Sequence, residues 1–246
     1  MDRRHFLALG ATATIAGCLG GRDGSGSSGE GTGSGGGTDT GTAEPTETTA
    51  ASETLDTHPA ARDLASQPML GPDPTEAAGV VVAFEDPSCP RCKDFEDETV
   101  PQIRSNLVEP GDVTLVFRGY PVIFEWGQPA VRALEAAYDA DPAAHWTLKD
   151  HYYAVQTEYR NADDAAAVYD MTETFLAENT AVDATAVIDR ARNGDFDGAV
   201  QTDLDAGMDA GAGGTTPHVF FFKDGVYQTK AAGVVSYPIV TRILQL

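Results

Sequence analysis

Basic side chains are scarce in this sequence. Its 246 residues include 16 lysines and arginines against 38 aspartates and glutamates, which gives a formal net charge of −22. A nucleic-acid partner requires a basic face that neutralises its phosphates, so we expect no such partner. The acids are dispersed along the chain rather than gathered in one tail. This pattern indicates either a surface adapted to high salt, as in halophilic proteins, or simply an acidic protein.

Cysteine is also rare, since the chain contains only Cys18, Cys89 and Cys92. A structural zinc site takes four ligands, often as two Cys-x-x-Cys pairs, and the sequence has no second pair. The histidines do not complete a site, because His145 and His151 are spaced to point in different directions on one expected helix and the others are isolated. We therefore expect no metal site and no other cofactor.

Long apolar runs are absent as well. The strongest candidate, residues 6–16, is too short to cross a bilayer as a helix but has the length of the hydrophobic part of a signal peptide. It follows Arg3-Arg4 and leads through small residues to Cys18, which resembles a twin-arginine export signal ending in a lipobox. We expect residues 1–18 to direct export and Cys18 to carry a lipid anchor on the extracytoplasmic face of the membrane. The alternative is a cytoplasmic protein with a chance basic start.

Large apolar side chains are almost missing from residues 19–58, which consist mainly of Gly, Ser, Thr, Glu, Asp and Ala. Such a segment cannot bury enough surface to offset its ordering entropy, so we expect a disordered tether with a reach of about 35 Å. Residues 59–246 are long enough for one domain with its own core. Disulfides persist outside the cytoplasm, so the expected export allows a Cys89–Cys92 bond.

The remaining sequence alternates strand and helix patterns. Apolar β-branched runs predict strands, an Asp-Gly turn at 224–225 predicts a hairpin, and Pro101 is expected to kink the first helix. The pattern predicts an α/β fold in which a helical block separates two sets of strands. The expected strands are 79–84, 113–118, 217–222 and 226–230; the expected helices begin at 91 and at 237 and cover 128–140, 141–159, 163–179, 183–193 and 197–210.

The motif Cys89-Pro90-Arg91-Cys92 lies where a predicted strand turns into a helix. Ser88 is suited to be the N-cap of that helix, and Pro90 is suited to its first turn. Free N–H groups and the positive end of the helix then point at Cys89 and favour its thiolate, and the charge of Arg91 acts in the same direction. Cys92, one turn on, is expected to stay protonated. The motif indicates a redox-active pair with an oxidising disulfide; half of a metal site and a structural disulfide are the alternatives.

Four acids follow the motif on the same expected helix, namely Asp94, Glu96, Asp97 and Glu98. Their charges oppose the thiolate of Cys89. We expect them to face solvent, so that the helix dipole and Arg91 dominate.

Together these motifs resemble the DsbA-like thioredoxin-fold family. The resemblance is carried by Phe84-Glu85-Asp86 ahead of the Cys-Pro-x-Cys motif, by residues 113–121 (VTLVFRGYP), and by Gly214-Thr215-Thr216-Pro217 before an aromatic strand and hairpin. It implies a thioredoxin fold with an inserted helical domain over about residues 126–210. It also implies a thiol-disulfide oxidoreductase, most simply one that acts as an oxidant.

The resemblance further implies roles for single residues. Cys89 is expected to be the nucleophile, Cys92 the resolving cysteine and Pro217 a cis proline that faces the disulfide. The backbone at Thr216 is expected to pair with a substrate strand, and the two residues between the cysteines tune the site. The implied partners are cysteine-containing exported proteins and an unidentified redox partner, and we expect a monomer.

Three questions stay open at this point. Relatives carry an acid six residues before the first cysteine, where this chain has Ala83, and either Glu85 or Asp86 is a candidate substitute. The chain is also compatible with a reductase, with an isomerase, or with a tethered binding module whose disulfide is only structural. The aromatic residues that follow the second strand, Tyr120, Phe124 and Trp126, either pack in the core or line an apolar groove.

Overall fold

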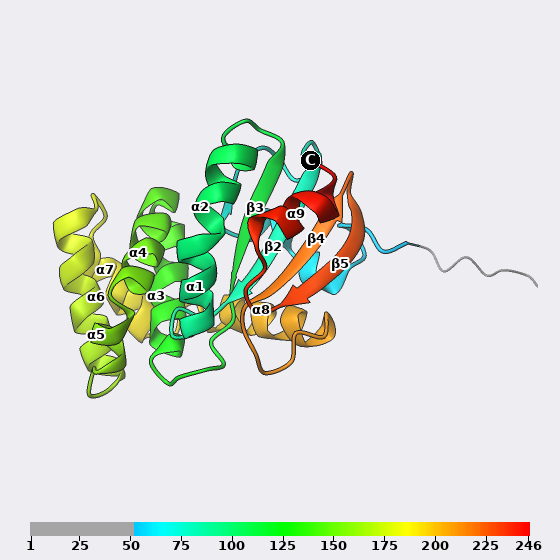
Figure 1. Cartoon of the computed structure of the whole chain (residues 1–246). Coiled ribbons are helices and arrows are strands. Elements are labelled where there is room, and N and C mark those ends of the chain that lie inside the picture. The colour runs from blue at the N-terminus through cyan, green and yellow to red at the C-terminus, as the bar shows by residue number, and fades with distance from the viewer. Residues whose placement is uncertain (1–51) are drawn as a thin grey trace, which may run out of the picture. The chain divides into compact units, whose positions relative to one another are not determined.

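The computed structural model describes residues 52–246, which belong to one compact unit. The predicted signal at residues 1–18, with Cys18, lies outside the described residues. A five-stranded mixed sheet in the order β1-β3-β2-β4-β5 runs through the middle of this unit (Figure 1). Its strands are β1 (Met69–Leu70), β2 (Gly79–Glu85), β3 (Val113–Gly119), β4 (His218–Lys223) and β5 (Val226–Ala232). Strands β2 and β3 are parallel, and the other pairs are antiparallel.

The helices fall into three groups. Helices α1 (Pro90–Glu98), α2 (Val100–Ile103) and α9 (Tyr237–Leu244) cover one face of the sheet (Figure 1). Helices α3 (Gly127–Ala140), α4 (Pro142–Ala154), α5 (Gln156–Arg160), α6 (Ala165–Asn179), α7 (Ala184–Arg192) and α8 (Asp197–Asp209) lie between β3 and β4 in the sequence. Short 3₁₀ turns occupy Pro59–Ala61 and Leu64–Ser66, and a π turn occupies Arg104–Val108.

The two faces of the sheet follow from the alternation of side chains along each strand. In β2, Val81 and Ala83 pack against the first group of helices, whereas Val80, Val82 and Phe84 point to the opposite face. The whole of β2 and β3 is buried, as expected for central strands covered on both sides. This arrangement holds the end of β2, and therefore the cysteine motif, on a rigid base.

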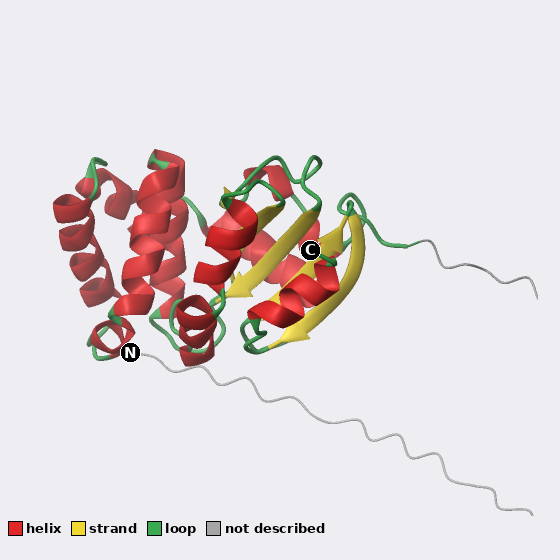
Figure 2. Cartoon of the chain, turned by 45° about the horizontal axis from the view of Figure 1, so that its top comes forward, coloured by secondary structure: helices red, strands yellow, loops and turns green. Residues whose placement is uncertain are grey.

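The helical insertion has its own core and stands beside the sheet (Figure 2). Its capping signals are local, since Asp141, Asp164 and Asp183 each accept a backbone N–H at the start of α4, α6 and α7. The last insertion helix, α8, instead covers the second face of the sheet through Ala206. The α/β fold with inserted helices that the sequence predicts is therefore confirmed.

The predicted tether is wrong at its C-terminal boundary. Thr54 bridges to Val226 of β5, and the ring of His58 is buried among Phe220, Phe222 and Tyr227. Residues 52–67 thus form a strap over the sheet, which we call the N-terminal strap. The low apolar content of the segment concealed it, because the strap is held mainly by backbone bonds and one aromatic cluster.

Two further details differ from the prediction, and a third agrees with it. Strand β1 was not predicted, because it has only two residues. The expected helix 141–159 is divided into α4 and α5 at Val155, which lies outside helical geometry. The helix after the cysteines breaks at Thr99, two residues before Pro101, which confirms the expected distortion. Within residues 52–246, the helices are all too short or too polar to cross a membrane.

Candidate functional site

The cysteine pair lies just beyond the C-terminal end of the central strand β2. Cys89 occupies the N-cap position of α1, Pro90 is the first helical residue, and the amide of Cys89 donates to the carbonyl of Asp86. The expectation that Ser88 caps this helix is wrong, because its hydroxyl accepts the amide of Phe124 instead. Both cysteines are free thiols, with exposed fractions of 3 % for Cys89 and 0 % for Cys92.

The two sulfurs have opposite acidities. The pKa of Cys89 is lowered to about 6, mainly by the hydrogen bond from the Cys92 thiol and also by the backbone amides of Cys92 and Arg91, while burial opposes the shift. The pKa of Cys92 is raised well above its usual value, mainly by burial and also by Cys89 and the nearby Glu85. Cys89 is therefore the more acidic of the two thiols, a property that suits a nucleophile, and Cys92 holds its proton to higher pH.

Arg91 acts on Cys89 differently from the sequence-based prediction. Its backbone amide helps to stabilise the thiolate, but its guanidinium is exposed and lies next to Gly233. The largest causes of the low pKa of Cys89 are hydrogen bonds, so the charge of Arg91 is not its main cause. The direction of a long side chain cannot be read from its position in a motif.

The loop before β4 brings a second segment to the cysteines. The Thr216–Pro217 peptide bond is cis, and the Cys89 thiol lies 3.5 Å from the carbonyl oxygen of Thr216, to which it donates. The hydroxyl oxygen of Thr216 is buried without a hydrogen-bond partner. The structure thus brings Thr216 and Pro217 next to Cys89 and Cys92, although more than a hundred residues separate the two segments in the sequence.

A buried acid lies beside Cys92. Glu85, the last residue of β2, accepts a hydrogen bond from the Tyr153 hydroxyl at 3.0 Å. Burial and the neighbouring Glu96 raise the pKa of Glu85 well above its usual range, despite the opposing charge of Lys149. The carboxyl of Glu85 therefore holds its proton to a higher pH than an ordinary glutamate, and it lies next to the sulfur of Cys92.

The candidate substitute Asp86 has a different environment. Its two carboxylate oxygens accept the amides of Ser88, Val122 and Ile123 at 2.7–2.9 Å. Burial raises its pKa while these bonds oppose the rise. Asp86 is thus committed to holding two loops together, and Glu85 is the acid that faces Cys92.

The insertion supplies three side chains to the site that sequence reasoning missed. Lys149 of α4 is buried and lies 2.6 Å from Glu96, so Glu96 does not face solvent as expected. Tyr153 of α4 packs against both cysteines. Gln156 of α5 donates to the carbonyls of Pro87 and Cys89 at 2.8 and 3.0 Å. No local signal marks these residues, because a lysine and a glutamine on a helix resemble surface residues.

A small hollow reaches this buried cluster from the side. It has a volume of about 210 Å³ and is lined by Glu96 and Tyr153 together with residues of α1, α2 and α4. The pair Arg104–Asp150 stands at the same hollow, with its two bonds of 3.2 Å each. Solvent thus comes close to the buried cluster of Glu85, Glu96 and Lys149 from a side that does not involve Thr216 or Pro217.

The three aromatic residues after β3 have different roles. Tyr120 is buried and donates to the carbonyl of Gly213 at 2.7 Å, and Trp126 stacks on Tyr159 in the core of the insertion. Core packing therefore explains these two. Phe124 is 37 % exposed and contributes to the surface near the cysteines.

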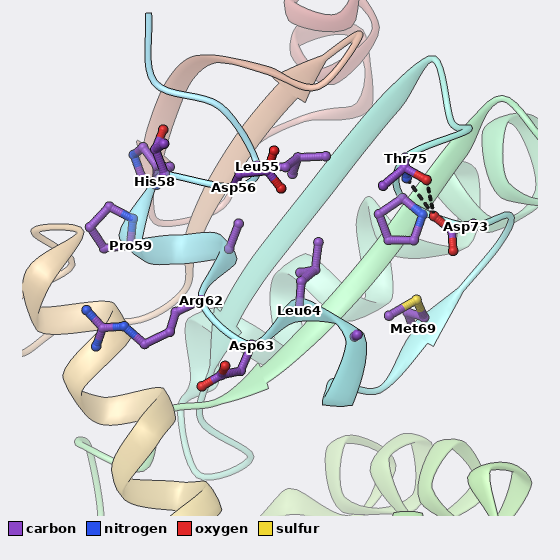
Figure 3. A pocket seen from close by; sticks show the side chains of 14 residues that line it. Leu55, Asp56, His58, Pro59, Arg62, Asp63, Leu64, Met69, Asp73 and Thr75 are labelled. Carbon is purple, nitrogen blue, oxygen red and sulfur yellow. Dashed lines mark hydrogen bonds between the residues drawn. The ribbon is translucent and has the colours of Figure 1, made fainter.

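A further cavity lies away from the cysteines. It has a volume of about 690 Å³ and is formed by the N-terminal strap and the segment around β1, with Leu55, Leu64 and Met69 among its lining (Figure 3). Asp73 on its rim is bonded to Thr75. Residues 52–246 contain no group of three or more acids, histidines and cysteines placed to hold a metal ion.

Comparisons with known proteins agree with this geometry. A family model described as "Thioredoxin" matches residues 67–231. Disulfide bond formation protein D of Bacillus subtilis is 30% identical over 95 residues, which are 39% of this chain and 42% of that protein. The chain therefore matches less than half the length of this curated relative.

Solved structures show the same fold over a longer span. The crystal structure of BdbD from Bacillus subtilis has a TM-score of 0.58 at 21% identity and covers 74% of this chain and 95% of that one. Chlamydia trachomatis DsbA has a TM-score of 0.59 at 22% identity, with 73% and 90% covered. The chain belongs to the thioredoxin family and has the DsbA-like form of its fold, in which a helical region is inserted into the thioredoxin core.

Proposed function

We propose that this protein is a thiol-disulfide oxidoreductase that exchanges a Cys89–Cys92 disulfide with cysteine-containing proteins. The observation that carries the proposal is the contrast between the two sulfurs, with a pKa of about 6 for Cys89 and a raised pKa for Cys92. A structural disulfide needs no such contrast, and the small loop it closes would add little stability. The similarity to disulfide bond formation protein D supports the same activity.

The proposed reaction begins with the oxidised pair. A substrate thiolate attacks the sulfur of Cys89, the Cys89–Cys92 bond breaks, and Cys92 leaves with the electron pair and takes a proton. A second substrate thiolate then attacks the substrate sulfur of the mixed disulfide, and Cys89 leaves as a stable thiolate. The substrate is oxidised to a disulfide, and the protein is reduced to the dithiol.

Glu85 is proposed as the proton donor and acceptor for Cys92. It is buried beside Cys92, has a pKa raised by burial and by Glu96, and is bonded to Tyr153. Because Cys92 is fully buried, a charge left on its sulfur would be costly unless a proton arrives from a neighbouring group. Thr216 and Pro217 are proposed to face the substrate, with the backbone of Thr216 available to pair with its chain.

The direction of the reaction depends on the reduction potential. At pH 7 a pKa near 6 for Cys89 favours the reduced form by about 1 kcal/mol, which raises the potential by roughly 20 mV. Potentials within the thioredoxin fold span about −270 to −120 mV, so this contribution alone does not separate an oxidant from a reductant. We propose the oxidant role because the lowered pKa of Cys89 shifts the potential in the oxidising direction and because the curated relative that the chain matches is a disulfide bond formation protein.

The experiment that tests the function is equilibration of the pair with glutathione buffers. The full chain would carry Cys18→Ser, so that only Cys89 and Cys92 titrate. A potential near the oxidising end of the range supports a disulfide donor, and one near the reducing end supports a reductase. A pair that does not exchange at all leaves only a binding module with a structural disulfide. Cys89→Ser should abolish turnover of a reduced substrate protein.

We also propose that the protein works outside the cytoplasm on a lipid anchor. The support is the sequence before the described residues, in which Arg3-Arg4, an apolar stretch and Cys18 follow one another. Cys18→Ala should release the protein from the membrane fraction, and retention there would contradict the anchor. Adaptation to high salt is supported only by the net charge of −22, and full stability without added salt would count against it.

A further inference from the structure

The described part of the chain has few cations, and most of them are paired. Residues 52–246 contain 13 lysines and arginines, and 9 of these lie within 4.0 Å of a carboxylate, which leaves 4. One of the 4, Lys230, bonds to the carbonyls of Ala210 and Gly211. In the described structure, Arg91, Arg160 and Arg242 have neither an ion pair nor a hydrogen bond from their side chains. In so acidic a chain, unpaired guanidinium groups are noteworthy.

Arg91 lies beside the loop that carries Pro217. A Cβ atom added to Gly233 would be 3.8 Å from the central guanidinium carbon of Arg91 and 3.8 and 3.9 Å from its terminal nitrogens. These nearly equal distances mean that the guanidinium plane faces the backbone of Gly233. The amide of Gly233 in turn donates to the carbonyl of Pro217 at 2.8 Å. The edge of the guanidinium is open to solvent, and the next residue, Val234, is 40 % exposed.

Arg160 lies over the loop that carries Phe124, close to the cysteine motif. Its guanidinium stands 4.2 Å above the ring of Phe124, whose amide is bonded to Ser88 next to the motif. Both residues line a hollow of about 650 Å³ that begins at Ile123, which packs against the two cysteines. Three acids line the same hollow, namely Glu125, Asp163 and Asp164, so they outnumber the one cation there and weaken the attraction of Arg160 for a carboxylate.

Both arginines therefore lie close to the cysteine motif: Arg91 belongs to it and lies beside the loop of Pro217, and Arg160 lies over the ring of Phe124. We propose that Arg91, and Arg160 to a smaller degree, bind carboxylates of the substrate, so that the preferred substrates are extended segments with acidic residues near the reacting cysteine. This inference rests on the proposed function, because it specifies the substrates of the same site. Phe124 and Val234 would contact the apolar side chains of such a segment.

The chemistry of the two groups fits this role. A guanidinium binds a carboxylate through two parallel hydrogen bonds, and neither of these arginines must first give up an internal partner. A net charge of −22 repels acidic polypeptides, so local cations at the opening compensate where the substrate approaches. Exposed ion pairs are weak, so the expected preference is about 2- to 5-fold for each arginine.

The test measures the rate at which single-cysteine peptides reduce the Cys89–Cys92 disulfide. Three peptides of equal length would carry Asp, Asn or Lys on both sides of the cysteine. Each rate would be divided by the rate of the same peptide with a small neutral disulfide, which removes differences in thiol acidity. The unmodified site should prefer the Asp peptide over the Lys peptide by about 10-fold at low salt, and added salt should reduce this preference.

Variants then assign the preference to residues. Arg91→Gln should lower the rate for the Asp peptide about 3-fold relative to the Asn peptide, Arg160→Gln should have a smaller effect, and the matched control Arg242→Gln should have none. Equal slowing of all three peptides by Arg91→Gln would mean that Arg91 tunes the disulfide rather than binds substrate, and would overturn the inference. Equal rates for the three peptides with the unmodified site would also overturn it, while leaving the proposed function intact. A failure to react with any peptide would instead contradict the proposed function.

Discussion

Two buried clusters of the same composition lie at one edge of the sheet. Each contains one cation and two carboxyl groups: Lys149 with Glu96 and Glu85, and Arg118 with Asp203 and Glu135. In each cluster the cation pairs with one acid, at 2.6 Å for Lys149–Glu96 and 2.7 Å for Arg118–Asp203. The other acid has a raised pKa in both, in the case of Glu135 to about 8 through burial and the charge of Asp203.

The clusters differ in what lies next to the neutral acid. Glu85 faces Cys92, whereas the cluster of Glu135 holds the chain together. Arg118 donates to Asp203, to the carbonyl of Ala60 at 3.1 Å and to that of Arg62 at 2.6 Å. A buried acid with a raised pKa therefore does not by itself mark a functional site. Its role depends on whether a neighbouring group exchanges protons with it.

The largest expected effect is a loss of stability when the buried Arg118–Asp203 pair is broken. Asp203→Ala leaves the fully buried guanidinium of Arg118 without its partner, so we expect the free energy of unfolding to fall by about 3–5 kcal/mol. Denaturant titration would measure it. The surface pair Arg190–Asp139 provides the control, since Asp139→Ala should cost less than about 1 kcal/mol. Similar losses for the two variants would show that Arg118 is not structural.

The second prediction concerns rate. Glu85→Gln keeps the size and neutral charge of the protonated acid but cannot transfer a proton, so we expect disulfide exchange to slow by about 10²-fold. Stability at neutral pH should change little. Glu135→Gln is the matched control in the other cluster and should leave the rate unchanged. If Glu85→Gln and Glu135→Gln both react at the rate of the unmodified protein, Glu85 has no part in proton transfer and the two clusters do not differ in function.

The third prediction separates the clusters by pH. Because the pKa of Glu135 is raised to about 8 in the folded protein, its contribution to stability is complete below about pH 4.5 and is lost as the pH rises through 8. Glu135→Gln removes this loss and should be more stable than the unmodified protein at pH 9 by roughly 1–3 kcal/mol. Unfolding measurements at pH 5 and 9 would show a difference at the higher pH only.

The smallest effect is on the acidity of Cys89. The hydrogen bond from the Cys92 thiol is the main cause of its low pKa, so Cys92→Ala should raise the pKa of Cys89 from about 6 toward the ordinary value of a cysteine. The ultraviolet absorbance of the thiolate, followed against pH, measures this change. Arg91→Gln keeps the backbone amide and should leave the pKa nearly unchanged. A larger rise with Arg91→Gln than with Cys92→Ala would restore the charge-based explanation.

The sequence predicted the parts of this site that depend on neighbouring residues. A strand, a turn and a Cys-Pro-x-Cys helix start are local, and Pro217 was found because a Thr-Pro step before an aromatic strand resembles a known family. Lys149 and Tyr153 could not be found in this way. They become functional neighbours only because α4 packs against α1, and this contact depends on the tertiary arrangement of the insertion.

The N-terminal strap has a mechanical consequence. A pull applied to the chain at residue 52 would first load the Thr54–Val226 bridge. Val226 pairs with Lys223, and Lys223 pairs with Gly79, the first residue of β2, whereas Cys89 follows the last. The load would therefore enter at the end of the sheet that lies away from the sulfurs. It would reach them only after the strap had been pulled off the sheet up to Ala60 and Arg62, whose carbonyls bond to Arg118. The redox site is in this way shielded from tension along the chain.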